Sequence, residues 1–132
     1  MTKEELAVYV LREKYPKYFP REMVVEDWVK DNIVLMTDDD NYALFEWMNK
    51  DTVSGHYFFT NTNPKKSVEL SRHFIKELFS LAPDINKIVG STPLEHKAAL
   101  ALTKKLGFTH LYNTDEESVS ILTRGTIQQW AS

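Results

Sequence analysis

Two lysines stand at the start of a predicted helix, where positive charge is unusual. Asn63 can cap this helix and Pro64 fits its first turn. Lys65, Lys66 and Ser67 follow. A helix N-terminus offers unpaired amides and the positive end of the helix dipole, so it normally favours Asp or Glu. Amides, two ammonium groups and a hydroxyl would suit a pyrophosphate. Alternatively, both lysines point into water, at a cost of only about 0.3–1 kcal/mol each.

Consecutive aspartates at positions 38–40 are a second concentration of charge. They lack the glycine and the spaced ligands of a calcium loop. With Asn41 they have the short polar side chains of a tight turn between two strands. The sequence contains no cysteine, which excludes disulfides, thiolate zinc sites and cysteine nucleophiles. We therefore predict no metal site.

Hydrophobic spacing and turn residues predict a single mixed α/β domain. The 132 residues, 42% of them apolar, are enough for one core. The predicted order is N-terminal helices over 1–32, antiparallel strands over 33–60, a helix–strand–helix unit over 61–108 and C-terminal strands over 109–132. The individual strands are predicted at Ile33–Thr37, Tyr42–Trp47, His56–Thr60, Lys87–Gly90, Thr109–Tyr112 and Val119–Thr123.

Two helices in the middle of the chain have clear sequence signals. The first is predicted over Pro64–Leu81, with a buried stripe at Ser71, Phe74, Ile75 and Leu78. The second is predicted to start in the segment 92–95, TPLE, which has a capping threonine, a first-turn proline and a capping-box glutamate. Gly107 is predicted to end it in a left-handed conformation.

Charge and hydropathy exclude several classes of partner. A net charge of −3 gives no electrostatic reason to expect nucleic acid or an anionic membrane. The longest apolar runs are only a few residues, and the N-terminus lacks the apolar segment of a secretion signal. We therefore expect a cytoplasmic protein.

The segment KIVGSTPLEHKAALALTKKLGF, residues 87–108, together with the element order, resembles the GNAT superfamily of acetyl-CoA-dependent N-acetyltransferases. That family commonly has a strand followed by Asn-x-x-Ala-x-x-x-Tyr-x-x-x-Gly-Phe. Ala99, Gly107 and Phe108 match this pattern. His96 takes the place of the asparagine and Thr103 that of the tyrosine. The resemblance covers roughly residues 33–124. The chain length and the VGST strand end are most similar to short GNAT-like proteins of tailed bacteriophages, which would act in the bacterial host cytoplasm.

The resemblance implies a V-shaped, splayed central sheet flanked by helices. It also implies acetyl-CoA as co-substrate and a small-molecule or protein amine as acceptor. The family's glycine-rich pyrophosphate loop would fall on 61–67, which has no glycine. The implied cofactor contacts are Phe59, Thr60, Asn61, Lys65, Lys66, Ser67 and His96.

The implied chemistry needs a base for the amine, a donor for the carbonyl oxygen and an acid for the thiolate. Glu46 and His56 are the candidate bases, although each could instead be a surface or core-edge residue. A backbone amide near residues 58–60 would hold the oxygen. Thr103 is a far weaker acid than a phenol, which leaves Tyr112, His96 or water to protonate the thiolate.

Three functions agree with these observations. The first is an active N-acetyltransferase. The second is a GNAT-like protein without catalysis that has a structural or partner-binding role, and the third is an unrelated α/β interaction module. A homodimer is compatible with each.

Overall fold

A six-stranded mixed β-sheet forms the centre of the fold. The computed structural model describes residues 12, 27, 30–37, 41–59 and 63–130. The strand order is β1-β2-β3-β4-β6-β5, and every neighbouring pair is antiparallel except β3 and β4. The strands are β1 (Ile33–Met36), β2 (Tyr42–Trp47), β3 (Thr52–Phe58), β4 (Lys87–Pro93), β5 (Thr109–Asn113) and β6 (Glu117–Thr123). The predicted mixed α/β class is confirmed.

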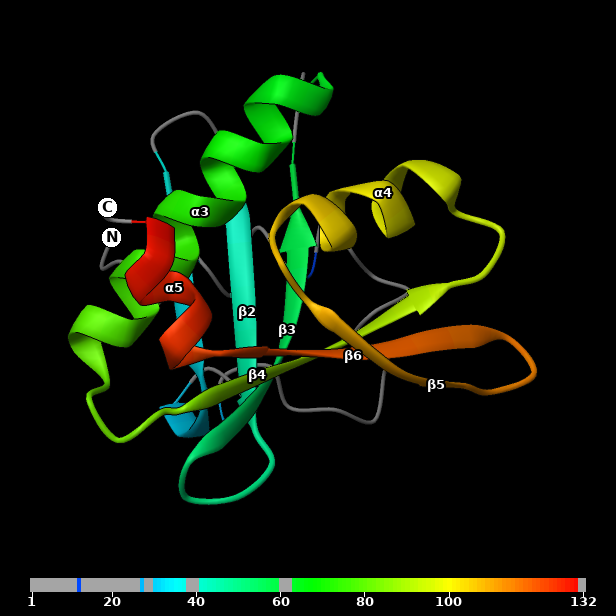
Figure 1. Ribbon diagram of the computed structural model, residues 1–132. Coiled ribbons are helices and arrows are strands. Elements are labelled where there is room, and N and C mark those ends of the chain that lie inside the picture. The colour runs from blue at the N-terminus through cyan, green and yellow to red at the C-terminus, as the bar shows by residue number, and fades with distance from the viewer. Residues whose placement is uncertain (1–11, 13–26, 28–29, 38–40, 60–62, 131–132) are drawn as a thin grey trace.

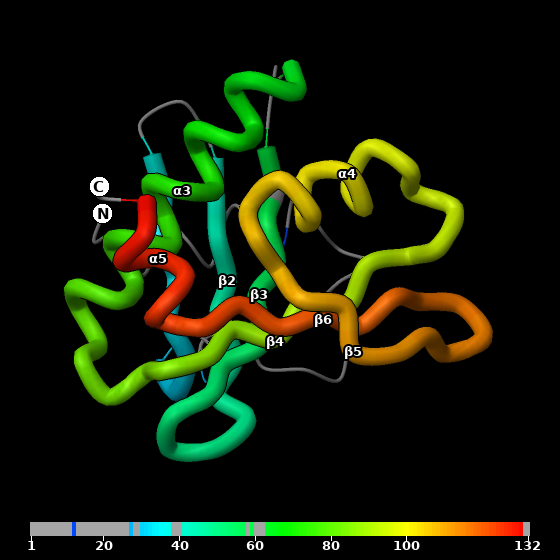
Figure 2. Tube along the Cα trace, in the orientation of Figure 1, coloured from blue at the N-terminus to red at the C-terminus, as the bar shows by residue number. Residues whose placement is uncertain are grey.

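Three helices follow the antiparallel strands in the chain. They are α3 (Pro64–Leu81), α4 (Lys97–Lys105) and α5 (Arg124–Trp130). All three lie on one face of the sheet, with α4 set apart from α3 (Figures 1 and 2). In the same view β2 and β3 run steeply, whereas β4, β5 and β6 run across them. The sheet is therefore strongly twisted at the junction of β3 and β4.

The hydrophobic core lies between this face and α3. Phe45, Val53 and Ile88 come from successive strands and are fully buried, as are Phe74 and Leu78 of the helix. The predicted buried stripe of α3 is thus confirmed. Its i, i+3, i+4 spacing places these side chains on one helix face, which packs against alternate residues of each strand.

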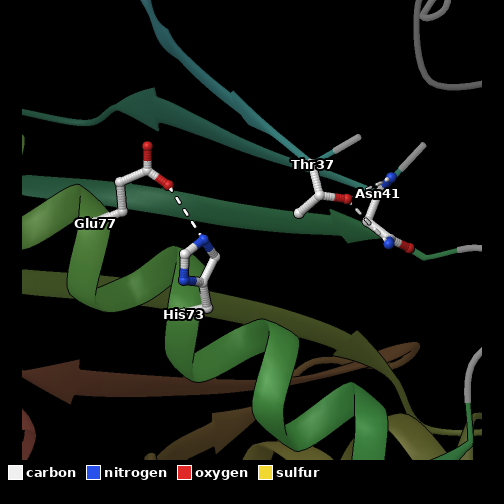
Figure 3. Close-up of polar contacts among 4 residues, drawn as sticks. All are labelled: Thr37, Asn41, His73 and Glu77. Atoms are coloured by element: carbon white, nitrogen blue, oxygen red, sulfur yellow. Dashed lines mark hydrogen bonds and ion pairs between the residues drawn. The ribbon is translucent and has the colours of Figure 1, made fainter. Parts of the chain in front are cut away.

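Short polar contacts close the β1–β2 hairpin. The Thr37 amide donates to the Asn41 carbonyl at 2.9 Å, and Asn41 Nδ2 donates to Thr37 Oγ1 at 3.1 Å (Figure 3). Asn41 is fully buried, so these bonds satisfy polar groups that would otherwise be costly to bury. The hairpin was predicted, but residues 38–40 lie outside the described part of the chain.

Strand pairing moves several predicted boundaries. β3 begins at Thr52 rather than His56, and β4 continues to Pro93 because it pairs with β6 at seven positions. The prediction that a helix starts in segment 92–95 is therefore wrong: α4 starts at Lys97. A proline at the end of a strand loses little, since few ladder bonds remain there. Here the long antiparallel ladder outweighs the local capping motif.

The C-terminal helix α5 was not predicted. Its seven residues include Gly125 and Thr126, which are poor helix formers. It is held by tertiary contacts, because Ile127 is buried and Arg72 of α3 lies over the Trp130 ring at 5.4 Å. Of the two predicted N-terminal helices, the described residues 12, 27, 30 and 31 are helical, and the remainder lies outside the described part of the chain.

Arg124 joins the start of α5 to the end of α3. Its guanidinium donates to the carbonyls of Phe79, Ala82, Pro83 and Ile85, and it lies 4.5 Å from the centroid of the Phe79 ring. A cation at a helix C-terminus satisfies carbonyls that have no partner within the helix. One side chain thus fixes the helix end from which the chain enters β4.

Candidate active site

The parallel strands β3 and β4 separate partway along their length. They pair only as Thr52↔Lys87, Val53↔Ile88 and Ser54↔Val89, although both strands continue beyond these positions. The splayed central sheet that the GNAT resemblance implied is confirmed, but the paired residues of β3 precede the predicted strand His56–Thr60. Gly55 lies where the strands part, and a Cβ there would be 3.2 Å from Ile88 Cγ2. Glycine therefore permits this close approach.

A cavity of about 700 Å³ occupies the gap that this separation opens. Its walls come from β3, β4, the first turns of α3 and almost the whole of α4. Both faces of the strands contribute, since His56 lies on the face opposite α3 whereas Tyr57 and Gly90 lie on the face toward the helices. The cavity therefore reaches from the helical layer into the opening between the strands.

One edge of β3 offers backbone groups to this cavity. The amides of Thr37 and Met48 donate to the carbonyls of Asn41 and Thr52. In an antiparallel ladder, pairs that exchange backbone hydrogen bonds alternate with pairs that do not. Counting along β2 and β3 from the bonded pair Met48 and Thr52, Leu44↔His56 is a hydrogen-bonded pair and Ala43↔Tyr57 is not. The Thr37–Asn41 bond agrees, because it directs the backbone groups of Ala43 toward β1. The Tyr57 amide consequently points away from β2, toward the side where β4 has separated. This is one residue before the predicted segment 58–60.

His56 and Glu46 lie on the same face of the sheet. His56 pairs with Leu44 and Glu46 pairs with Ser54, which makes the two side chains diagonal neighbours. His56 lines the cavity and Glu46 is exposed. Burial lowers the pKa of His56 from its ordinary value of 6.5, and the negative charge of Glu46 acts in the opposite direction. The two predicted base candidates are therefore brought together, with a neutral imidazole at the cavity wall at pH 7.

The first turn of α3 contributes polar groups. Asn63 and Ser67 line the cavity. Asn63 Oδ1 accepts from the Lys66 amide at 2.9 Å, and the Asn63 carbonyl accepts from the Ser67 amide at 2.9 Å. The predicted cap is confirmed, and it occupies an amide that we expected to be free. Lys65 is exposed and Lys66 half-buried; neither is part of the cavity lining.

Thr103 lines the cavity, but its hydroxyl is engaged elsewhere. Its Oγ1 donates to the Ala99 carbonyl at 2.9 Å, one turn earlier in α4. Tyr112, on β5, is 55% exposed and does not belong to the lining. His96 is exposed at the N-terminal end of α4, also apart from the lining. Neither of the two side chains expected as proton donors, Tyr112 and His96, lines the cavity, and the Thr103 hydroxyl already donates within α4.

Aromatic residues at the end of β3 and directly after it form one wall. Tyr57 packs edge-on against Phe45, with ring centroids 6.1 Å apart, and Phe59 stacks on Phe74 at 6.3 Å. Tyr57 and Phe59 both line the cavity. The GNAT resemblance implied Phe59 as a cofactor contact, and its side chain does line the cavity. Of the other predicted contacts, Thr60 and Asn61 lie outside the described residues.

Sequence reasoning missed several cavity residues. Gly55, Gly90 and Leu102 are among them. The glycines had a usable signal, since an isolated glycine within a strand indicates a close approach. Leu102 was predicted only as an apolar residue of the helix. Which apolar residues face a cavity rather than the core depends on where the sheet opens.

The described residues contain neither a cluster of metal ligands nor a helix that could span a membrane. Over residues 12, 27, 30–37, 41–59 and 63–130, no three metal-ligating side chains gather in one place. Within those same ranges, no helix has the length and hydropathy needed to cross a bilayer.

No family model and no curated protein matches the sequence. In contrast, 73 chains of solved structures match the fold. N-acetyltransferase PseH from Campylobacter jejuni superposes with a TM-score of 0.67 at 13% identity, covering 94% of this chain and 92% of PseH. FdhC, a nucleotide-linked sugar GNAT, gives 0.69 at 10% identity, covering 99% and 90%. Aminoglycoside acetyltransferase AAC(6')-Ib gives 0.64 at 14% identity, covering 98% and 94%.

These three similarities extend over 94–99% of the chain. The third possibility considered from the sequence, an α/β interaction module, is therefore wrong in its assumption of an unrelated fold. The protein has the fold of the GNAT N-acetyltransferases.

Proposed function

We propose that the protein is an N-acetyltransferase that moves an acetyl group from acetyl-CoA to an amine. The observation that carries this proposal is the cavity between β3 and β4, whose walls include a half-buried imidazole and a β3 backbone amide that points away from β2. PseH has been solved with acetyl coenzyme A and AAC(6')-Ib with coenzyme A, which supports the same donor here.

The residues at the cavity fit a CoA thioester. The Tyr57 amide would donate to the thioester carbonyl oxygen, where negative charge develops during attack. The diphosphate would bind at the start of α3, where it would contact Ser67, Lys65 and Lys66. Asn63 Oδ1 already accepts from the Lys66 amide. We therefore expect either that the Asn63 side chain rotates away when the diphosphate binds, or that the diphosphate is bound mainly by the ammonium groups of Lys65 and Lys66. Phe59 would pack against the donor.

His56 would act as the base. Its lowered pKa keeps the imidazole neutral at pH 7, so it can accept a proton from the amine directly or through one water. The amine nitrogen then bonds to the acyl carbon while the carbon–sulfur bond breaks. Water is the best candidate to protonate the leaving thiolate. The Thr103 hydroxyl already donates within α4, and Tyr112 and His96 lie outside the cavity lining.

The acceptor is a small-molecule or protein amine. Glu46 is exposed beside His56. A carboxylate there favours an acceptor that arrives as an ammonium ion, since opposite charges attract before the proton is removed. One structural neighbour is a spermidine N-acetyltransferase from Vibrio cholerae and another acts on aminoglycosides. We therefore place cationic amines first among acceptors to be tested.

A second candidate is a GNAT-like protein that binds a CoA ester without turnover and has a structural or partner-binding role. The bonded Thr103 hydroxyl and the capped Lys66 amide favour it. The homodimer, the cytoplasmic location and the phage origin stay predictions.

Thiol release from acetyl-CoA, measured over a panel of amines, tests the proposal. We expect His56→Asn to lower kcat/KM by about 10²–10⁴-fold. The matched control is His73→Asn: His73 is 64% exposed on α3, 3.7 Å from Glu77 (Figure 3) and outside the cavity lining. It should change kcat/KM less than twofold. Equal activity of His56→Asn and the parent would contradict the proposed base. Binding of CoA esters without any turnover would favour the second candidate.

A further inference from the structure

Strand β5 forms one edge of the sheet and has little of the usual protection of an edge. Among the strands that the structure describes, β5 lies beside β6 alone, and all five of its residues, THLYN, are exposed. The residues of the opposite edge strand, β1, are buried or half-buried. Edge strands in native proteins are commonly protected by charged side chains, proline or bulges. β5 has no Lys, Arg, Asp, Glu or Pro, and only one bulge, between His110 and Tyr112.

Two large apolar side chains are exposed next to each other on this strand. Leu111 is 50% exposed and Tyr112 is 55% exposed. The other exposed large hydrophobic side chains of the described residues lie elsewhere, at the β2–β3 turn and the end of α3: Trp47, Met48 and Leu81. A second strand beside β5 would both cover apolar surface and pair with the backbone at the edge of the sheet.

The two ends of β5 carry opposite charge. The turn that follows the strand has Asp115 and Glu116, and the end of α4 that precedes the strand has Lys104 and Lys105. All four side chains are exposed. Figure 1 shows the tip of the β5–β6 hairpin and the last turn of α4 at opposite ends of β5. The edge is therefore acidic at one end, basic at the other and uncharged between them.

We propose that two copies of the chain pair antiparallel through β5, around a two-fold axis near Leu111. In antiparallel strands the end of one lies beside the start of the other. Asp115 and Glu116 of each copy would therefore lie near Lys104 and Lys105 of its partner, twice in the dimer. A parallel pairing in register would instead bring like charges together. Because the charge pattern complements itself only in the antiparallel arrangement, a second copy is the partner that fits this edge. The inference does not depend on the proposed function.

Sedimentation velocity of the full chain tests whether the dimer forms. The paired surface is small, so we use chain concentrations from about 1 to about 300 µM, the range expected for a weak interface. The weight-average mass should rise from 15.4 kDa toward twice this value and no further, because a two-fold interface closes with two copies. A mass that stays at one chain throughout would overturn the inference, and so would growth beyond two.

A charge placed on the edge tests whether β5 forms the interface. Leu111→Lys should raise the dissociation constant of the dimer at least tenfold, since a lysine on an edge strand opposes pairing. The matched control is Leu81→Lys, the same change at a 64% exposed position at the end of α3, which should leave this constant within twofold. If circular dichroism shows that Leu111→Lys does not fold, Tyr112→Lys replaces it. Equal effects of the edge variant and the control would exclude β5 as the interface.

A charge exchange tests the antiparallel arrangement. Lys104→Glu with Lys105→Glu should weaken the dimer at least fivefold, and so should Asp115→Lys with Glu116→Lys, because each pair of changes brings like charges together. All four substitutions in one chain should return the dissociation constant to within about threefold of the parent, because opposite charges meet again. A folded chain with all four changes that stays as weak as either pair would contradict the antiparallel arrangement.

Discussion

Thr103 illustrates that a side chain at a reactive position can be unavailable for chemistry. Its hydroxyl lies in the cavity wall but donates to the Ala99 carbonyl. Such back-bonding is common for threonine within helices. His56 differs, because burial lowers its pKa and leaves a neutral nitrogen that can accept a proton. At the residue scale, the environment of each group decides its role.

Replacing Thr103 by Val should preserve most acetyl transfer. Valine is nearly isosteric, and the lost hydroxyl already bonds within α4. We expect kcat to stay within about threefold of the parent in a steady-state thiol-release assay, because a general acid would contribute about 10²–10⁴-fold. A loss of a hundredfold would show that the threonine has a catalytic role.

The pair of Glu46 and His56 predicts a shift in the pH dependence of activity. Glu46 raises the pKa of His56 and burial lowers it, with burial the larger effect. The base works when neutral, so kcat/KM should rise with pH through the His56 pKa, below 6.5. Glu46→Gln removes the charge that raises this pKa. The acid limb of the kcat/KM profile should therefore move to lower pH, and a move to higher pH would contradict the assignment.

Sequence patterns identified His56, Phe59, Ser67 and Thr103 before any coordinates, and all four line the cavity. The role of the Tyr57 amide could not be predicted, because it depends on which strand pairs hydrogen bond. The exposure of Tyr112 likewise follows from the place of β5 at the sheet edge. These properties arise from strand pairing, which residue types alone do not specify.

At the scale of elements, the N-terminus of α3 is the predicted anchor of the donor. Lys65→Glu combined with Lys66→Glu should weaken acetyl-CoA binding by at least tenfold, since two charges near a diphosphate are reversed. The melting temperature should change little, because one lysine is exposed and the other half-buried. Calorimetry would measure the binding.

The control reverses two exposed lysines elsewhere, Lys30→Glu with Lys50→Glu. It changes the net charge by the same amount and should leave the affinity within about threefold, because surface charges far from the ligand are screened by salt. Equal affinity of the α3 variant and this control would show that the diphosphate binds elsewhere.

Arg124 is predicted to be an important structural side chain of the C-terminal region. It donates to carbonyls at the end of α3 and in the loop before β4. Arg124→Lys keeps the charge but replaces a planar group of several donors by a single ammonium. We expect the free energy of unfolding in urea to fall by about 1.5–3 kcal/mol. If the free energy of unfolding changed by less than about 0.5 kcal/mol, the carbonyls would be hydrogen bonded equally well by water in the absence of the guanidinium.

Element types were predicted well where periodicity is strong, as in α3. They were predicted poorly where tertiary contacts compete with local signals. The TPLE segment has a good capping motif, but the pairing of β4 with β6 extends through Pro93. In α5, Gly125 and Thr126 disfavour a helix, whereas the burial of Ile127 stabilises one. Intrinsic helix propensity contributes less to the stability of these elements than strand pairing and side-chain burial do.

For the whole molecule, the order of elements together with the segment of residues 87–108 predicted the GNAT fold, which the structure confirms. A strand–helix–strand–helix–strand centre restricts the topology, since β3 and β4 must be parallel and joined through α3. The sequence could not specify where the two strands separate. The pairing ends at Ser54↔Val89, one residue before Gly55, whereas β4 stays paired with β6 as far as Pro93. The site therefore depends on packing across the entire sheet.

In the proposed complex, a CoA thioester binds in the gap between β3 and β4 with its carbonyl oxygen on the Tyr57 amide. An ¹H–¹⁵N NMR titration of the full chain with acetyl-CoA would detect this complex. We expect saturation at one equivalent, with large shifts at Tyr57 and Gly90 and little change in the β1–β2 hairpin. Absence of binding, or shifts confined to residues remote from the gap, would contradict it.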